Sequence, residues 1–428
     1  MSREGYKMTE LGEIPQEWNI CRVFDIRDKS DKYSFTGGPF GSNLKSCDYT
    51  EDGIRVIQLQ NIGDGYFSDQ YKIYTSQRKA DELISCNIYP GEIILAKMAD
   101  PVARACIIPN DENRYLMCSD GIRLKVDNNE CDSRYIMYSI NSEYFRKNAI
   151  ANSTGSTRLR IGLNELKNLP LIIPPLSEQQ KIADILSSVD QQIEQTDVLI
   201  EKTKELKKGL MQRLLTKGIG HTEFRDTEVG RIPKGWEVKK LLEIGDIVTG
   251  NTPKTSDKGN YGSEYLFVSP ADLGSKKYIE KTSKMLSKSG FEKTRRLPKG
   301  SILVTCIGST IGKIGIASKE LCTNQQINSI VCREQYSNEY IYYAIDFNFW
   351  RYESFISTQA VPIINKTVFS GFEIAIPPLD EQIKIASILS EIDEKIDAYV
   401  KKRGKFDILK SGLMQKLLTG KIRVLINV

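Results

Sequence analysis

Apolar residues recur along two long stretches of the chain at steps that mostly alternate between four and three. The first stretch runs from Ile182 to Leu214 and the second from Ile385 to Leu417. This spacing places the apolar side chains along one narrow face of a helix and is typical of a coiled coil. A face that narrow is buried only against another helix, and each stretch is the natural partner of the other. We expect the pairing to involve Ile182, Leu186, Val189, Ile193, Ile200, Leu210, Ile385, Leu389, Ile392, Ile396, Phe406 and Leu413, with Leu206 and Leu409 on the same faces.

The two helical stretches belong to an internal repeat. Residues 174–187 return at 377–390 with eleven of fourteen letters identical, and residues 209–216 return at 412–419 with seven of eight identical. Each copy starts with a double proline, which cannot lie inside a helix and therefore marks its beginning. Ser177 and Asp380 follow the prolines and are predicted to be the N-caps. Each predicted helix has about 40 residues and a length of roughly 60 Å.

The repeat continues outside the helices, so each half of the chain is predicted to be a globular module followed by one helix. Residues 11–18 resemble residues 229–236, and residues 89–95 resemble residues 297–303. Runs of β-formers bounded by Gly, Pro, Asp or Asn predict strands, and two aromatic-rich stretches predict helices that close the modules. The strands are expected at 53–62, 91–97, 264–268, 300–307 and 314–317, and the helices at 135–148 and 340–355. We expect the aromatic side chains of these two helices to be core residues.

The pattern as a whole predicts an α+β protein. Two mixed α/β modules are separated by two long helices, which form an antiparallel coiled coil with an internal pseudo-twofold repeat. The expected divisions are 1–173 for the first module, 174–218 for the first helical region, 219–376 for the second module and 377–428 for the second helical region. A chain of 428 residues exceeds a single hydrophobic core, which agrees with such a division.

Composition excludes several classes of protein. Hydrophobic residues make up 40% of the chain and charged residues 27%, as in ordinary globular proteins. The sequence has no run of eighteen apolar residues and no apolar segment of a signal peptide at its start, so we expect a cytoplasmic protein without a membrane partner. The nine cysteines contain no CxxC pair and are expected to be reduced, structural thiols. The single histidine, His221, is expected to be a solvated linker residue, which argues against histidine-based catalysis and metal binding.

Catalytic motifs are also missing. Residues 308–314 resemble a phosphate-binding loop but have one residue too few between the glycines, and Ile follows the lysine where Ser or Thr is required. No dinucleotide-binding glycine motif and no Asn-Pro-Pro-Tyr motif for base methylation occur. The one Glu-x-Lys match to a nuclease site, residues 165–167, has no acidic partner at a plausible distance upstream. The sequence therefore predicts a protein that binds and does not catalyse.

Basic clusters and polar loops indicate what could be bound. The net charge of +5 is modest, but Lys and Arg concentrate at 201–217 and 399–421. Such clusters suit nucleic acid or an acidic partner, and equally a solvated helix face. Loops rich in Gly, Ser, Thr, Asn and Gln lie at 37–46, 153–160, 250–255 and 323–328. Their side chains can donate to and accept from base edges, although many polar loops are simply solvated.

In this combination the motifs resemble the specificity subunit of type I restriction-modification systems. The resemblance rests on the repeated blocks Pro-Pro-Leu-x-Glu-Gln-x-x-Ile-Ala-x-Ile-Leu and Gly-Leu-Met-Gln-x-Leu-Leu-Thr, on the module starts Ile-Pro-x-x-Trp, and on the loops Gly-Pro-Phe-Gly-Ser and Thr-Asn-Gln-Gln-Ile-Asn. It covers essentially the whole chain, and the order and duplication of the motifs make it specific.

The resemblance implies a non-catalytic DNA-recognition subunit. Each of two target recognition domains would read one half of a bipartite site in double-stranded DNA, and the site would be asymmetric because the modules differ. The coiled coil would set the spacer between the half-sites and dock two modification (methyltransferase) subunits. Restriction subunits would add translocation and cleavage. S-adenosylmethionine, ATP and Mg would be bound by these partner subunits, with no cofactor or metal in this chain.

No set of DNA-contacting residues carries over from the family, so the candidates follow from loop chemistry. In the first module they are Ser42, Asn43, Lys45, Lys97, Thr157, Arg158 and Arg160. In the second module they are Asn251, Lys254, Lys313, Asn324, Gln325, Gln326 and Gln359. Arg158 and Arg160 are the most attractive ligands for phosphate or guanine, whereas the aligned segment 361–363 has no arginine.

Two other interpretations stay open. The chain could be the specificity subunit of another restriction-methylation class that uses the same plan with a different catalytic partner. Alternatively, it could be a coiled-coil scaffold that binds only proteins, in which case the isolated chain would show no salt-dependent binding to DNA.

Overall fold

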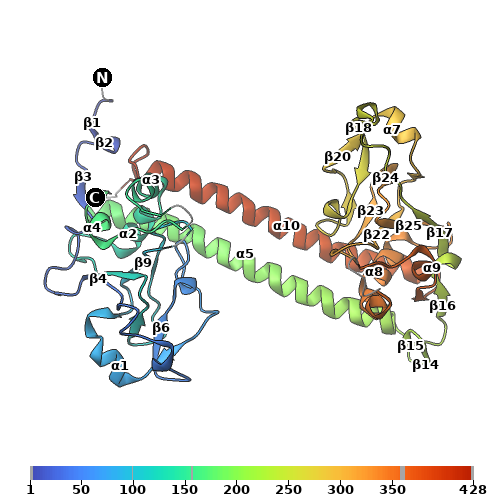
Figure 1. The fold of residues 1–428 in the computed structure, drawn as a ribbon, viewed down its shortest axis with the longest axis horizontal. Helices are drawn as coiled ribbons and strands as arrows, with labels where there is room; N and C mark the ends of the chain where they lie inside the picture. The colour runs from blue at the N-terminus through green and yellow to red at the C-terminus, as the bar shows by residue number, and fades with distance from the viewer. Residues whose placement is uncertain (1–2, 99, 156–157, 357–361, 426–428) are drawn as a thin grey trace. The chain divides into compact units, whose positions relative to one another are not determined.

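The structure is a computed structural model that describes residues 3–98, 100–155, 158–356 and 362–425 (Figure 1). The chain forms two compact units. The first unit comprises Met1–Thr196 and Lys402–Val428, and the second comprises Asp197–Lys401. Each unit therefore contains one globular module together with parts of both long helices.

The first module is built on two small sheets. One sheet has the strand order β10-β9-β12-β4 with antiparallel pairs throughout, and the other has the order β5-β7-β6-β11-β8, in which β6 and β11 are parallel. The pair β3-β13 joins the beginning of the module to its end. The strands are β1 (Tyr6–Thr9), β2 (Gly12–Pro15), β3 (Asn19–Arg22), β4 (Phe35–Gly37), β5 (Tyr49–Thr50), β6 (Ile54–Ile57), β7 (Tyr74–Thr75), β8 (Asn87–Ile88), β9 (Ile93–Ala96), β10 (Ala105–Ile107), β11 (Tyr115–Met117), β12 (Gly121–Leu124) and β13 (Pro170–Ile173).

The second module repeats this topology. Its order β23-β22-β25-β17 corresponds to β10-β9-β12-β4, and β20-β18-β24-β21 corresponds to β7-β6-β11-β8, including a parallel pair, β18 with β24. A further strand, β19, is parallel to β23. The strands are β14 (Phe224–Thr227), β15 (Gly230–Pro233), β16 (Glu237–Lys240), β17 (Gly245–Thr249), β18 (Tyr261–Val268), β19 (Tyr278–Ile279), β20 (Lys284–Leu286), β21 (Arg296–Leu297), β22 (Ile302–Thr305), β23 (Ile314–Ala317), β24 (Leu321–Thr323), β25 (Ile327–Cys332) and β26 (Glu373–Ile376).

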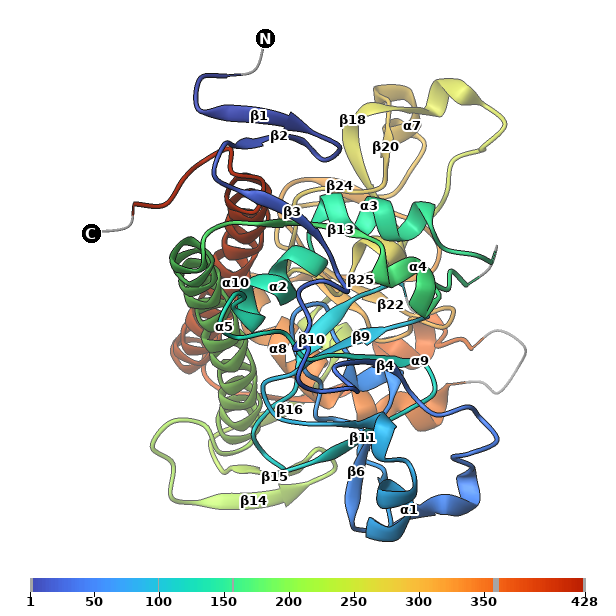
Figure 2. The ribbon, with the colours of Figure 1, turned by 90° about the vertical axis from the view of Figure 1, so that its left-hand side faces the viewer.

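Short helices cover the sheets, and α2 lies between the long helices and β10 (Figure 2). The α-helices are α1 (Gln77–Glu82), α2 (Ser133–Ile140), α3 (Glu143–Ala151), α4 (Leu163–Lys167), α5 (Leu176–Lys217), α6 (Leu241–Ile244), α7 (Lys288–Glu292), α8 (Asn338–Asn348), α9 (Lys366–Ser370) and α10 (Leu379–Leu417). The 3-10 helices are η1 (Ser46–Asp48), η2 (Leu59–Asn61), η3 (Ile84–Cys86), η4 (Lys258–Asn260), η5 (Pro270–Asp272) and η6 (Phe349–Phe355).

The predicted helix 135–148 is two helices in the structure. The break lies at Asn141 and Ser142, where the Asn141 side chain leaves the helix to exchange two hydrogen bonds with the backbone of Ala105. Ser142 then caps α3 by accepting from the Phe145 N–H at 3.4 Å. Asn and Ser favour such local bonds over a continued helix, which explains the division. The predicted helix 340–355 is α8 followed by η6.

Each module has its own large core, and the long helices contribute to both. The prediction that the aromatic residues of the closing helices are core residues is confirmed for Tyr135 and Tyr340, which are fully buried, and is wrong for Trp350, which is 67% exposed. The core of the first unit includes Trp18, Tyr135, Phe145, Ile182, Leu186, Leu417 and Leu418. The core of the second unit includes Trp236, Tyr340, Phe369, Leu214, Leu215, Ile385 and Leu389.

The two long helices are uninterrupted and pair antiparallel. In the first unit the start of α5 packs against the end of α10, with Ile182, Leu186, Leu413 and Leu417 in one cluster. In the second unit the end of α5 packs against the start of α10, with Leu210, Leu214, Ile385 and Leu389 in one cluster. All twelve residues selected for helix pairing are buried or half-buried. The prediction of an antiparallel coiled coil with an internal repeat is thus confirmed.

Two details of the helix predictions are wrong. The carbonyl of Pro175 accepts from the N–H groups of Glu178 and Gln179, so α5 begins at Leu176 and Ser177 already lies inside it. The equivalent carbonyl of Pro378 makes Asp380 a first-turn residue of α10 rather than its N-cap. Proline fixes φ near about −65°, which is compatible with the residue before a helix, so each long helix can begin directly after its proline pair.

Leu206 and Leu409 do not lie in the helix seam as predicted. They are 52% and 47% exposed, whereas the neighbouring lysines, Lys207 and Lys410, have side chains only 21% exposed. The stem of each lysine covers apolar surface in the seam while its ammonium group forms an ion pair across it. The apolar spacing therefore shifts by one residue at this turn.

His221 is not a solvated linker residue. Its Nε2 atom lies 3.0 Å from both carboxylate oxygens of Glu381, and its side chain is 30% exposed. The indole N–H of Trp236 donates to the same carboxylate at 3.1 Å. In the first unit Glu178 accepts equivalent bonds from Trp18 and from Arg423. His221 therefore anchors the segment after α5 to the beginning of α10.

Candidate nucleic-acid interface

The first selected loop of the first module, 37–46, begins at the end of β4, and the second, 153–160, follows α3. The candidate Lys97 comes directly after β9. Gly38 follows β4 and crosses the turn between β11 and β12, where a Cβ atom on it would lie 1.7 Å from the carbonyl oxygen of Cys118. Only glycine fits such a crossing, and its N–H donates to the carbonyl of Gly121 at 2.8 Å. The Lys97 Nζ atom lies 3.6 Å from the position of a Cβ atom on Gly37. The loop after β4 therefore starts beside Lys97.

Arg160 lies at the same edge of the sheet. Its backbone pairs with that of Met98, and its Nη2 atom donates to Asp120 Oδ1 at 2.9 Å. The carbonyl of Asp120 also accepts from the Lys97 N–H at 2.7 Å, so Asp120 brings the two basic residues together. The Arg160 side chain remains 52% exposed. A guanidinium that is half exposed and held by one carboxylate still has N–H donors for a phosphate or a guanine.

The other candidates of the first module lie on exposed loops. Ser42, Asn43, Lys45 and Arg158 are all exposed. The Ser42 hydroxyl donates to Asn43 Oδ1 at 3.3 Å, and the Lys45 N–H donates to Asp48 Oδ2 at 2.7 Å. No described contact joins this group to Lys97 and Arg160. Thr157 lies outside the residues that the structure describes.

In the second module several candidates meet in one cluster. The Asn251 N–H donates to the carbonyl of Thr323 at 3.0 Å, next to Asn324, whose side chain donates to Gln326 Oε1 at 2.9 Å. The Thr252 hydroxyl donates to Gln325 Oε1 at 2.5 Å. The loops 250–255 and 323–328 are thus brought together. Lys254 and Lys313 are exposed, and no hydrogen bond or ion pair is described for their ammonium groups. Gln359 lies outside the described residues.

Two basic residues beside this cluster were missed by the sequence analysis. The Asn251 side chain donates to the carbonyl of Lys293 at 3.1 Å and accepts from the N–H of Arg295 at 2.8 Å. The Arg295 guanidinium donates to the carbonyl of Thr249 at 2.6 Å. The basic run Lys293-Thr294-Arg295-Arg296 was the available signal, but its position beside Asn251 depends on the fold.

Backbone hydrogen bonds match the two modules residue by residue at this edge. The Lys97 N–H bonds to Asp120 O and its carbonyl to Ile161 N, while Cys306 makes the same two bonds with Gln326 and Ile364. Lys97 therefore corresponds to Cys306, Asp120 to Gln326, and Arg160 to Ile363. Cys306 is 1% exposed, and burial raises the pKa of its thiol to about 12. The matched positions are basic and acidic in the first module but neutral in the second.

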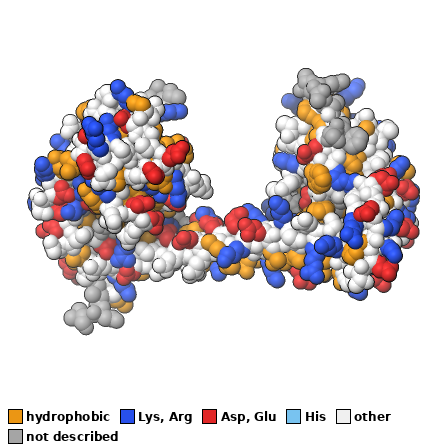
Figure 3. All heavy atoms as spheres, turned by 90° about the horizontal axis from the view of Figure 1, so that it is seen from below, with side chains coloured by type: hydrophobic (Ala, Val, Ile, Leu, Met, Phe, Trp, Pro, Cys, Tyr) orange, Lys and Arg blue, Asp and Glu red, His pale blue; other side chains and the backbone are white. Residues whose placement is uncertain are grey.

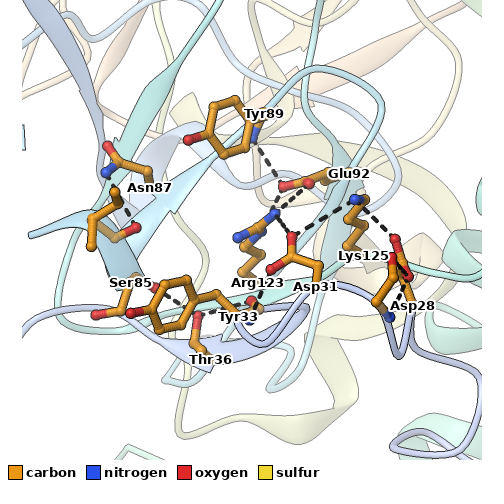
Figure 4. A network of polar contacts seen from close by, with 12 residues as sticks. Asp28, Asp31, Tyr33, Thr36, Ser85, Asn87, Tyr89, Glu92, Arg123 and Lys125 are labelled. Carbon is orange, nitrogen blue, oxygen red and sulfur yellow. Dashed lines mark hydrogen bonds and ion pairs between the residues drawn. The ribbon is translucent and has the colours of Figure 1, made fainter. Parts of the chain in front are cut away.

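A buried ion-pair network supports the first sheet (Figure 4). Arg123 of β12 is 3% exposed and forms two hydrogen bonds with the Glu92 carboxylate, at 2.7 and 2.6 Å, and one with Asp31 at 2.8 Å. Lys125 pairs with Asp28 at 2.9 Å. The Ser30 hydroxyl and the Lys125 ammonium hold the pKa of Asp28 well below its usual range. Removing one member would leave a buried charge, so this network fixes β12 and the segment before β9.

The two modules differ in charge around the second sheet. Residues 38–91 contain five Lys or Arg against seven Asp or Glu, a net charge of −2. Residues 250–299 contain eleven Lys or Arg against five Asp or Glu, a net charge of +6. Figure 3 shows blue and red side chains interspersed over the face that it presents. The excess positive charge of the second module favours contacts to phosphates.

The residues that the structure describes lack two other features. They contain no group of three or more His, Cys, Asp or Glu side chains that could hold a metal ion. Among the helices of the described residues none is long and apolar enough to cross a membrane.

Comparisons with known proteins agree with the topology. The family model described as the type I restriction modification DNA specificity domain matches residues 16–204 and 233–403. The chain is 26% identical to the putative type I restriction enzyme MjaX specificity subunit of Methanocaldococcus jannaschii, over 98% of this chain and 97% of that protein. It is 29% identical to the MjaVIII specificity subunit of the same organism, over 98% and 96%.

A solved structure has a similar fold. The S subunit of a type I restriction-modification system from M. genitalium matches with a TM-score of 0.59 and 16% identity, over 94% of this chain and 96% of that one. Since the family model matches both halves of the chain, each as one module and most of the long helix that follows it, the chain belongs to the family of type I restriction-modification DNA specificity subunits.

Proposed function

We propose that each module of this chain reads one half of an asymmetric, bipartite DNA site on behalf of a type I restriction-modification complex. The observation that carries the proposal is the contrast between the matched interface positions of the two modules. The modules share strand order and backbone bonds, yet Arg160 and Lys97 in one correspond to Ile363 and Cys306 in the other. The same scaffold with different side chains suits the reading of two different sequences.

The paired helices would set the number of unread base pairs between the half-sites. Each helix contributes to the core of both units, and α5 runs without interruption from Leu176 to Lys217. A helix of this length spans roughly 60 Å, which exceeds the 34 Å of one turn of DNA. Because the ion pairs Asp190–Lys410 and Lys207–Asp393 set the register, a spacer test must shorten both helices together.

The chain itself would be non-catalytic and would act with partners. Two modification subunits would dock on the two similar halves of the helix pair and bring S-adenosylmethionine to the DNA. Restriction subunits would bring ATP and Mg for translocation and cleavage. The repetition of the helix contacts in both units supports two equivalent docking surfaces.

The direct test is to express the chain with the modification subunits of its own system and to map methylated bases by sequencing. We expect one bipartite site with two unlike halves and a constant spacer. A palindromic site, or methylation without sequence preference, would contradict separate reading by the two modules. A chain that binds only proteins would show no salt-dependent contribution to DNA binding in the complex.

The spacer is tested by deleting seven residues from each helix between the two ion pairs, 194–200 in α5 and 397–403 in α10. Seven residues are close to two helical turns, so the apolar faces keep their register. We expect the complex to assemble and the spacer to change while both half-sites stay the same. An unchanged spacer would show that the helices do not set it.

A further inference from the structure

Phe40 stands out in the first module because 82% of its surface is exposed. It lies in the loop that follows β4, between Pro39 and Gly41. The apolar surface of a phenyl ring stabilises a protein only when it is removed from water, so this ring gives the isolated chain little stability. A single exposed apolar residue is common and needs no functional explanation by itself. The rigidity of the loop that carries Phe40 is therefore the second observation that matters.

The loop is fixed at both of its ends. At the start, Gly38 is locked over Cys118 and bonds to Gly121. At the end, Leu44 is 9% exposed and packs in a small cluster with Val56, Cys86 and Leu116. Between these anchors the Asn43 N–H donates to the Phe40 carbonyl at 2.8 Å and closes a turn. The loop therefore holds the ring outward, and binding a ligand there would require little ordering of the chain.

The position of Phe40 in the fold indicates what the ring would contact in a bound ligand. The loop begins beside Lys97, and Ser42 and Asn43 of the candidate interface follow within three residues. In the second module Gly250 corresponds to Gly38, because its N–H bonds to the carbonyl of Ile327 as that of Gly38 bonds to Gly121. Two residues further on, Phe40 therefore corresponds to Thr252.

Phenylalanine and threonine both offer an apolar group to the methyl group of thymine, which is the apolar feature of the major groove. We propose that the Phe40 ring contacts the C5-methyl group of one thymine in the half-site read by the first module. This inference rests on the proposed function and names one specificity contact within it. Ser42 and Asn43, whose side chains suit base edges, follow Phe40 in the same loop, so a duplex bound by this loop would bring a base edge near the ring.

The test uses the complete complex of the chain with its modification subunits and DNA that contains its mapped site. Each thymine of the first half-site is replaced in turn by deoxyuridine, which differs only by the missing methyl group. We expect one replacement to weaken binding by about 3- to 10-fold, the factor that burial of one methyl group supplies. In the complex with Phe40→Ala we expect weaker binding to the thymine site and no further effect of deoxyuridine.

Two other variants complete the experiment. Phe40→Leu keeps an apolar side chain and should retain part of the deoxyuridine effect. Ile84→Ala removes another exposed apolar side chain of the same module, 56% exposed, and should leave the effect unchanged. Because Phe40 is so exposed, Phe40→Ala should unfold at the same temperature as the original chain, which separates a lost contact from a damaged fold.

The proposal is overturned if no thymine of that half-site responds, or if Phe40→Ala keeps the full deoxyuridine effect. It is also overturned if 2-aminopurine in the half-site shows unstacking that depends on Phe40 without a deoxyuridine effect, since the ring would then insert between base pairs. A complex that reads a bipartite site but shows no methyl dependence would contradict only this inference. A complex without any sequence preference would contradict the proposed function.

Discussion

Lys410 of α10 and Asp190 of α5 form an ion pair of 2.6 Å, and the hydroxyl of Tyr138 donates to the same carboxylate at 2.7 Å. The second unit repeats these contacts with Lys207, Asp393 and Tyr343. Each ion pair joins the two long helices, and each tyrosine joins the ion pair to the closing helix of its module. The repeat of the sequence is thus a repeat of contacts between the reading modules and the helix pair.

The first prediction concerns Asp190. Replacing it by Ala leaves the hydroxyl of Tyr138, a residue only 3% exposed, with Ser187 at 3.3 Å as its remaining partner, and it removes the counter-charge of Lys410. We expect a loss of about 1–3 kcal/mol in the free energy of unfolding of the first unit. Denaturant unfolding of the full chain measures it, and Asp393→Ala should cost the second unit a similar amount.

Glu194→Ala serves as the control for Asp190→Ala. Glu194 is an exposed acidic residue on the same helix, and its replacement should change stability by less than about 0.5 kcal/mol. If Asp190→Ala were as harmless as this control, the shared contact would have no structural role.

The second prediction concerns the buried network of the first module. Arg123→Ala leaves the Glu92 carboxylate, 8% exposed, without its cation, and we expect a loss of about 3–5 kcal/mol in stability. The second module has Ser301 and Ser329 at the positions of Glu92 and Arg123, both buried. The double replacement Glu92→Ser and Arg123→Ser should therefore be more stable than Arg123→Ala in thermal unfolding. If the double variant were the less stable of the two, the cost would come from lost volume and not from an unpaired charge.

The third prediction concerns Lys293 and Arg295. They lie beside the polar cluster of the second module, in its most basic region, and phosphate contacts by these two residues would release counterions. Replacing both by Ala should reduce the slope of log K against log salt by about 1–2. Titrations of the complex with its site at several salt concentrations measure this slope.

Lys299 and Lys319 provide a control of equal charge for that experiment. Both are exposed, lie between β21 and β22 and between β23 and β24, and form no described hydrogen bond with Asn251. Their double replacement should leave the slope nearly unchanged. Equal effects of the two pairs would mean that the whole charge of the module matters, not a site beside Asn251.

The fourth prediction concerns the thiols. Burial raises the pKa of Cys106, Cys131 and Cys306 to about 12, so these groups stay protonated and covered at pH 8. Cys47 is exposed in η1, just after the loop that carries Phe40. A thiol reagent at pH 8 should therefore react fastest with Cys47, and Cys47→Ser should remove that fast phase. In the complex, specific DNA should slow the reaction of Cys47, and full reactivity in bound complex would place DNA away from this loop.

The sequence predicted the features that follow from local spacing of residues or that occur in both halves of the chain. The repeated blocks and the spacing of Ile182, Leu186, Ile385 and Leu389 were sufficient for the helix pair, because a regular period needs no knowledge of the tertiary fold. The expected strands 53–62, 91–97 and 300–307 are longer than β6, β9 and β22, whereas 314–317 coincides with β23 and 264–268 covers only part of β18.

What depends on distant contacts could not be predicted. His221 is bound to Glu381, which lies 160 residues away, and nothing near His221 in the sequence indicates that partner. Arg295 reaches the candidate interface only because β21 pairs with β24 and Asn251 bonds to its backbone. Lys207 and Lys410 enter the helix seam because each finds an aspartate on the opposite helix, a pairing that apolar spacing does not reveal.

The measurement that tests the central claim most directly is methylation mapping after a module exchange. Residues 11–170 are replaced by the corresponding residues of a relative that reads another sequence, and the long helices and the second module are kept. The complex is expressed with the same modification subunits, and its methylated sites are mapped by sequencing. We predict that one half-site changes while the other half-site and the spacer stay the same. A change in both half-sites, or in neither, would contradict the account of two independent readers on a shared helix pair.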